Sequence, residues 1–125
     1  MSFTLVPKYG EATEVNVWVW RPTLELIRNA KLIDEKSYEK MGRNDGDVQV
    51  DAVTAWKIAD LIDQTVEKMG PKDKLLLDLS ISDKPAKRGG VLKTEEDVLE
   101  GYSVGREWLK DFSVFSRDSG GFGVF

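Results

Sequence analysis

The pattern of apolar and polar positions along the chain predicts helices mixed with short strands. The clearest helix follows Asp51, which is placed to cap its first turn. Its apolar residues recur at spacings of three and four, so they share one face of a helix. This stripe consists of Ala55, Ile58, Ala59, Ile62 and Val66. Trp56 sits at one border of the stripe, and Gly70-Pro71 is expected to end the helix.

Two shorter helices are predicted ahead of it. Pro22 suits the first turn of a helix, where its missing N–H costs nothing, and that helix is expected to end near Lys31. Asp34 is placed to cap a second helix over residues 35–41, which Gly42 stops. Asn44-Asp45-Gly46 follows as a turn signal, because these residue types tolerate positive φ.

Two further helices are predicted in the C-terminal third of the chain. Thr94 and the acidic residues after it favour a short helix, because carboxylates stabilise the positive end of a helix. Ser103 is expected to open the last helix, which Ser119-Gly120-Gly121 terminates. One face of that helix carries Trp108, Leu109, Phe112 and Phe115.

Strands are predicted in four places, and two of these stay ambiguous. Residues 15–20 alternate β-branched with other residues, which favours a strand buried on both sides, but a helix capped by Asn16 is the alternative. Residues 75–82 favour a strand, and a helix is again possible there. Residues 3–6, closed by Pro7, indicate an edge strand or a tethered arm, and residues 122–125 a terminal strand or a docked tail.

These elements indicate an α+β fold: one helix-dominated domain over residues 1–125, with three to four helices and a small sheet. A chain of 125 residues suits one domain. Its hydrophobic fraction of 41%, with four tryptophans, is sufficient for a core.

The absence of histidine and cysteine narrows the chemistry most. Serine–histidine and cysteine–histidine catalysis, and zinc sites of the usual kind, are excluded. Asp45, Asp47 and Asp51 could gather around calcium, but their spacing does not fit an EF-hand loop. A turn followed by a helix cap explains them better. We therefore expect no catalytic residues, no metal site and no cofactor.

Net charge and hydropathy argue against further functional classes. The net charge of −4 argues against nucleic-acid binding, which usually needs a clustered positive face. No apolar stretch approaches the roughly 18 residues of a membrane span. The N-terminal residues lack a basic start and a long apolar run, so no signal peptide is expected and the predicted compartment is the cytoplasm.

The candidate surface for a protein partner combines aromatic and acidic residues. It consists of Trp18, Trp20, Glu95, Glu96 and Glu100. Tryptophan is enriched at binding hot spots, and acidic side chains speed encounter with a basic partner. The competing interpretations are burial of both tryptophans in the core and an ordinary solvated helix face for the acids.

An alternative site lies in the glycine-containing basic loop. Its residues are Lys84, Lys87, Arg88, Gly89 and Gly90. Glycine lets backbone N–H groups approach an anion, so a phosphate or nucleotide could bind here, with Tyr102 and Arg106 as further contacts. The arrangement does not match a P-loop, and a solvated surface loop is the competing interpretation.

Two segments resemble small uncharacterised bacterial and phage-borne proteins. They are Asn44-Asp45-Gly46, with the helix after Asp51, and the run from Trp108 into Ser119-Gly120-Gly121-Phe122. The resemblance brings no established activity with it. Some proteins of this size and style are cognate inhibitors encoded beside a toxin. This is an association between kinds of protein, and it identifies no functional site in this chain.

The sequence therefore predicts a non-enzymatic protein-binding module, in its sharpest form an immunity-type inhibitor that masks a basic toxin surface. The alternative is a small-ligand or nucleotide-binding protein that uses the loop at 84–93, for example in phage interference with host defence. The sequence does not indicate an oligomeric state.

Overall fold

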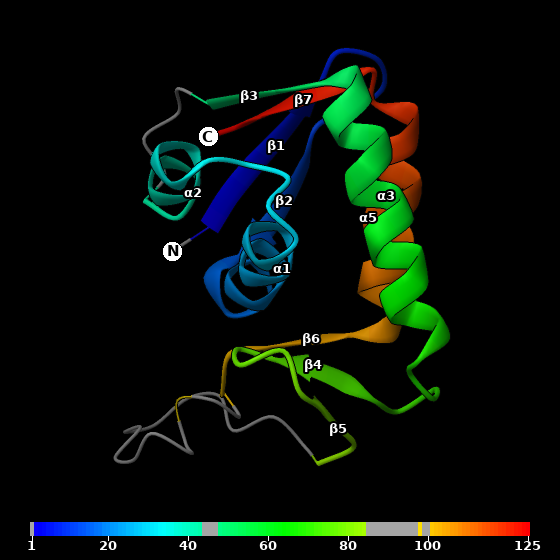
Figure 1. Ribbon diagram of the computed structural model, residues 1–125. Helices are drawn as coiled ribbons and strands as arrows, with labels where there is room; N and C mark the ends of the chain where they lie inside the picture. Colours follow the sequence, from blue (N-terminus) through cyan, green and yellow to red (C-terminus); the bar gives the residue numbers. More distant parts are fainter. Residues whose placement is uncertain (1, 44–47, 85–97, 99–100) are drawn as a thin grey trace.

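The first layer of the fold is a four-stranded antiparallel sheet (Figure 1). The computed structural model describes residues 2–43, 48–84, 98 and 101–125. The sheet contains β1 (Ser2–Pro7), β2 (Thr13–Asn16), β3 (Val48–Asp51) and β7 (Gly121–Val124), in the order β2-β1-β7-β3. The β7 strand therefore lies inside the sheet, with β1 on one side and β3 on the other.

The strand predicted for residues 122–125, as one of two alternatives, is confirmed as β7. The edge position predicted for residues 3–6 is wrong, because β1 lies between β2 and β7. The β1 strand pairs with β2 through Phe3 and Val15, and with β7 through Leu5 and Val124. Phe3 and Leu5 are fully buried. The local sequence could not predict this position, because the second strand that pairs with β1 is formed by residues 121–124.

A second, smaller sheet contains β4 (Lys74–Leu76), β5 (Ile81–Ser82) and β6 (Ser103–Gly105), in the order β5-β4-β6. Residues 75–82 are therefore not a helix, but they form two short strands joined by a turn and not one strand. The prediction that Ser103 opens the last helix is wrong, because Ser103 is buried and pairs with Leu76. That helix begins at Arg106, three residues later.

The helix α1 (Val17–Asn29) corrects the preferred interpretation of residues 15–20. The strand β2 ends at Asn16, and the Asn16 side chain accepts a hydrogen bond of 3.0 Å from the Val19 N–H. The chain turns from strand to helix at this cap. Trp20, Leu24 and Ile27 are fully buried at helical spacing, and their packing overrides the low helix preference of the β-branched residues before them. Pro22 lies inside the helix and not at its start.

The remaining described helices are α2 (Glu35–Met41), α3 (Ala52–Glu67) and α5 (Arg106–Asp118). The predicted caps are confirmed: Asp34 accepts from the Ser37 N–H and Asp51 from the Thr54 N–H, each at 2.7 Å. The helix α3 ends just before Gly70, close to the predicted stop. The helix predicted from Thr94 and the turn at 44–46 lie outside the described residues.

One continuous core joins the four-stranded sheet to α1, α3 and α5. The Trp20 ring lies 6.3 Å from Phe3 of the sheet and 5.9 Å from Phe112 of α5, between ring centres. The helices α3 and α5 run antiparallel, side by side (Figure 1), since Ser116 pairs with Ala55 and Ser113 with Ala59. Together these layers confirm the α+β fold class.

Candidate binding surface

The described residues contain no group of three or more acidic side chains arranged to hold a metal ion. Asp51, the one described member of the calcium candidate, is engaged as a helix cap. Asp45 and Asp47 lie outside the described residues.

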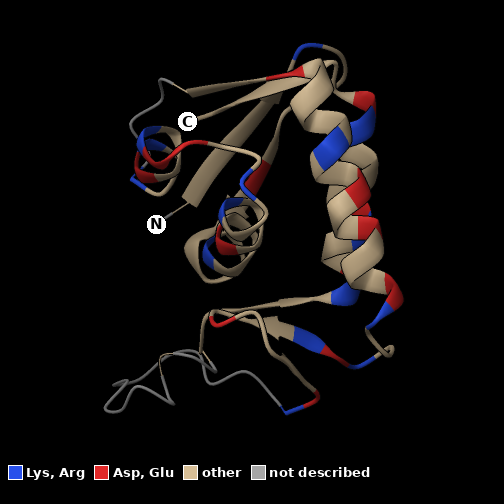
Figure 2. Cartoon of the chain, in the orientation of Figure 1, with Lys and Arg blue, Asp and Glu red and all other residues tan. Residues whose placement is uncertain are grey.

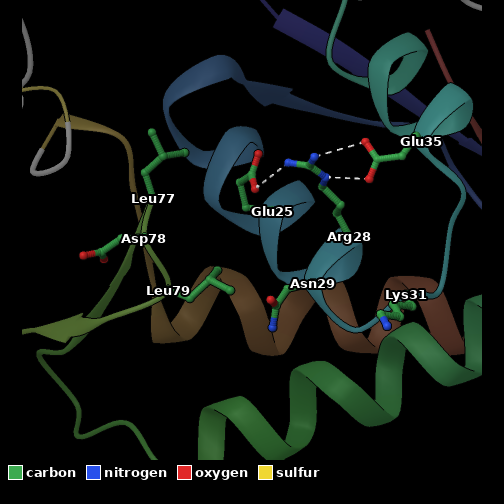
Figure 3. Close-up of a pocket in the computed structure, with 8 residues that line it drawn as sticks. All are labelled: Glu25, Arg28, Asn29, Lys31, Glu35, Leu77, Asp78 and Leu79. Atoms are coloured by element: carbon green, nitrogen blue, oxygen red, sulfur yellow. Dashed lines mark hydrogen bonds and ion pairs between the residues drawn. The ribbon is translucent and has the colours of Figure 1, made fainter.

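A hollow of about 400 Å³ lies between α1, the start of α2 and the β4–β5 hairpin (Figure 3). Its most prominent side chain is Arg28. The Arg28 guanidinium donates two hydrogen bonds to Glu35, at 2.9 and 3.1 Å, and lies 3.6 Å from a Glu25 oxygen. It also stacks on Tyr38, with 4.3 Å between the guanidinium carbon and the ring centre. The Tyr38 hydroxyl donates to Glu25.

Arg28, Glu25, Glu35 and Tyr38 therefore satisfy one another. The hydrogen bond to Glu35 is the largest of the effects that raise the Arg28 pKa above its ordinary value. Burial, followed by the hydrogen bond to Glu25, raises the Tyr38 pKa. A ligand would have to displace these existing contacts, so we assign the cluster to holding α2 against α1.

A second hollow, of about 420 Å³, lies where α5 begins. Its charged lining is balanced: three cations (Lys72, Lys74 and Arg106) face three acids (Asp73, Asp83 and Glu107). The Arg106 Nε is buried without a hydrogen-bond partner. Because this atom is shielded from solvent, a ligand in the hollow would not reach it, and the balanced charge selects neither anions nor cations.

The two candidate tryptophans occupy different environments. Trp20 is fully buried, and its indole N–H donates to the Met41 carbonyl at 3.0 Å. Trp20 therefore belongs to the core and offers no surface to a partner, which corrects its place among the candidate contacts. Trp18 is half-buried, with its ring centre 4.6 Å from that of Tyr102. Residues 18 and 20 lie on different sides of α1, because successive helical residues turn by about 100°.

The other candidate residues fall largely outside the described part of the chain. This applies to Lys87, Arg88, Gly89, Gly90, Glu95, Glu96 and Glu100. Lys84 is described and exposed. Its backbone carbonyl accepts a hydrogen bond of 3.4 Å from the Lys74 ammonium, and its N–H donates to Ser82 at 3.2 Å.

The most distinctive exposed group is a tryptophan that was not among the sequence candidates. Trp56 on α3 is 53% exposed. Val53, on the preceding turn of α3, is more exposed still, at 65%. A large indole held at a helix surface beside an aliphatic side chain is typical of contact surfaces.

The Trp56 ring is held in place by an ion-pair network. The Arg117 guanidinium carbon lies 4.4 Å from the ring centre. Arg117 bonds to Asp60 at 3.0 Å and to Asp63 at 2.7 Å, and Ser113 donates to Asp63. The hydrogen bond to Asp60 is the largest of the effects that raise the Arg117 pKa. One face of the indole is thus covered by an arginine that two carboxylates hold, and pre-ordered side chains of this kind lower the entropy cost of binding.

We call this region the α3–α5 face, and it comprises Val53, Trp56, Asp60, Asp63, Glu67 and Arg117. The sequence contains a signal for it. Trp56 lies outside the buried stripe, and acids follow at the fourth, seventh and eleventh positions after it. At these spacings Trp56 and the three acids lie in one row along the same side of α3. Figure 2 shows acidic positions recurring along the α3–α5 pair.

Among the described helices, none has the length and apolar character to cross a bilayer. No family model, curated protein or solved structure matches this chain.

Proposed function

We propose that this chain is a non-enzymatic protein-binding domain that uses the α3–α5 face as its contact surface. The observation that carries the proposal is the exposed indole of Trp56, clamped by Arg117. Tryptophan and arginine are the residue types that most often dominate binding energy at interfaces. Here the two lie in direct contact on rigid helices.

The charged groups around Trp56 support this function over catalysis. Asp60 and Asp63 are both engaged with Arg117, and their side chains are 62% and 53% exposed. Paired acids of a hydrolase instead flank a substrate at a fixed separation. In its sharpest form the domain is an immunity-type inhibitor, whose contact surface covers a functional region of a toxin.

In-cell cross-linking tests this function. A photoreactive amino acid replaces Val53, which is exposed and lies one turn from Trp56. We expect a discrete cross-linked protein after irradiation in the host cell, and its loss when Trp56→Ala is added. The matched control places the same photoreactive group at Lys36, an exposed position on α2. No adduct at position 53, or an equal adduct at position 36, would contradict the proposal.

A further inference from the structure

We propose that the α3–α5 face binds a cationic segment of its protein partner, in which a Lys or Arg side chain lies close to an aliphatic one. The aliphatic group packs on Trp56 and Val53, and the cation lies against Asp60, Asp63 and Glu67. This inference rests on the proposed function and specifies the partner's chemistry.

The charge of the face selects the cation. Asp60 and Asp63 share the single guanidinium of Arg117, so these three side chains together keep one net negative charge. The side chains of Asp60 and Asp63 are 62% and 53% exposed, so both retain oxygen atoms accessible to a partner. The exposed Lys57 lies three positions before Asp60, toward the Val53 end of the face. Glu67 is also exposed and adds a second charge one turn further along α3. A basic segment is attracted by this row, and an acidic or phosphate-bearing one is repelled.

The apolar end of the face selects the aliphatic group. Arg117 covers one face of the Trp56 indole, and more than half of the residue nevertheless stays exposed. Val53 extends this apolar surface by one helical turn. The order along α3 is therefore apolar first and acidic second, over roughly 20 Å from Val53 to Glu67 at about 1.5 Å per residue. A partner helix of about three to four turns matches this length.

A second copy of this chain does not supply that chemistry. The face carries one described cation, Arg117, and its guanidinium is already held by two carboxylates. Two such faces in a parallel arrangement would bring the acids of one against those of the other. An antiparallel arrangement would place the acids on Trp56 and Val53. In the antiparallel arrangement the exposed Lys57 offers one cation to the three acids of the other copy. Most of the exposed acids therefore stay unpaired in either arrangement, so a different protein is the better occupant.

A peptide-display selection against the full chain tests the proposed chemistry. The probe is a library of random helix-forming peptides of about fifteen residues, and binders that also recognise Trp56→Ala are removed. We expect the enriched peptides to share Lys or Arg residues one turn from Leu, Ile or Val. Their affinity is expected to fall as salt rises, because exposed charges are screened.

Two charge variants provide the matched comparison. Glu67→Gln removes a charge from the face without touching the Arg117 network, and we expect it to slow association of the enriched peptides about threefold to tenfold. Asp111→Asn removes an exposed acid of α5 outside the face, and we expect little change.

The outcomes separate the two proposals. Trp56-dependent peptides that are neutral or acidic would overturn the cationic partner while leaving protein binding at this face intact. If no Trp56-dependent peptide emerges, both lose their support. Trp56-dependent self-association in analytical ultracentrifugation would show that the face joins two copies, and would also overturn the inference.

Discussion

The indole N–H of Trp20 donates a hydrogen bond of 3.0 Å to the backbone carbonyl of Met41, across 21 positions of sequence. This bond joins a residue near the start of α1 to the end of α2, and both residues are fully buried. The carbonyl would otherwise lie without this partner in an apolar environment, where a missing hydrogen bond costs about 1–3 kcal/mol.

Replacing the buried tryptophan tests this bond. We expect Trp20→Phe to lower the free energy of unfolding by about 2–4 kcal/mol, because it removes the donor and leaves a small cavity. Trp18→Phe is the control, since Trp18 is half-buried, and we expect a loss below about 1 kcal/mol. Urea titration of both variants checks the difference. Equal effects would contradict the core role of Trp20.

The backbone of Lys31 is strained in a way that can be relieved. Lys31 follows the end of α1 with a φ of 60°, a conformation that favours glycine. We expect Lys31→Gly to raise the free energy of unfolding by about 0.5–1 kcal/mol. Lys31→Ala removes the same charge but keeps the Cβ atom, so it should give no comparable gain. Thermal unfolding of the pair separates strain from charge, and equal melting temperatures would argue against strain.

Gly121 at the start of β7 cannot accept a side chain. Its φ is 108°, and an added Cβ atom would lie 2.7 Å from the Val50 carbonyl oxygen. We expect Gly121→Ala to destabilise the fold by about 2–4 kcal/mol. Gly42→Ala is the matched control, because its φ is −86° and the nearest atom would lie 3.5 Å away. Chemical denaturation should show a neutral or slightly stabilising effect for this control, and a neutral result at Gly121 would contradict the prediction.

The cap at Asp51 makes stability depend on acid pH. The hydrogen bond from the Thr54 backbone N–H lowers the Asp51 pKa below its ordinary 3.8. A carboxyl group whose pKa is lower in the folded state stabilises the fold above its unfolded pKa, and this contribution is lost as pH falls through the folded value. Asp51→Asn keeps an oxygen acceptor at the cap but cannot titrate.

We therefore expect the stability difference between wild type and Asp51→Asn to be largest near neutral pH and to shrink below about pH 4. Denaturation curves collected from pH 7 to pH 2 provide the measurement. A difference that stays constant across this range would show that the carboxylate charge contributes nothing at the cap.

Sequence periodicity is sufficient to predict an element where one local signal dominates. The α3 helix carries a regular stripe and an Asp51 cap, and the structure confirms both. Around Val17–Trp20, alternation indicated a strand, but burial of Trp20 at helical spacing with Leu24 decided for a helix. The position of β1 depended on pairing with β7, which no local pattern reveals.

The proposed contact surface is harder to predict from the sequence than the fold. Trp56 was recognised only as the border of an apolar stripe, because its clamp comes from Arg117 on another helix. Trp18 and Trp20 are candidates because tryptophan is common at binding surfaces, but the apolar residues around Trp20 indicate burial and not binding. The row of acids after Trp56 marks one side of α3, but how far Trp56 is exposed also depends on how α5 packs against α3, which a pattern within one helix does not reveal.

The placement of β7 between β1 and β3 has a consequence during synthesis. A ribosome makes residues 2–7 long before residues 121–124, so the first strand must wait for its second neighbour until translation has passed residue 124. Phe3 and Leu5 remain incompletely covered throughout that interval, and the growing chain is then open to chaperones. The four-stranded sheet therefore cannot be completed before residues 121–124 have been made.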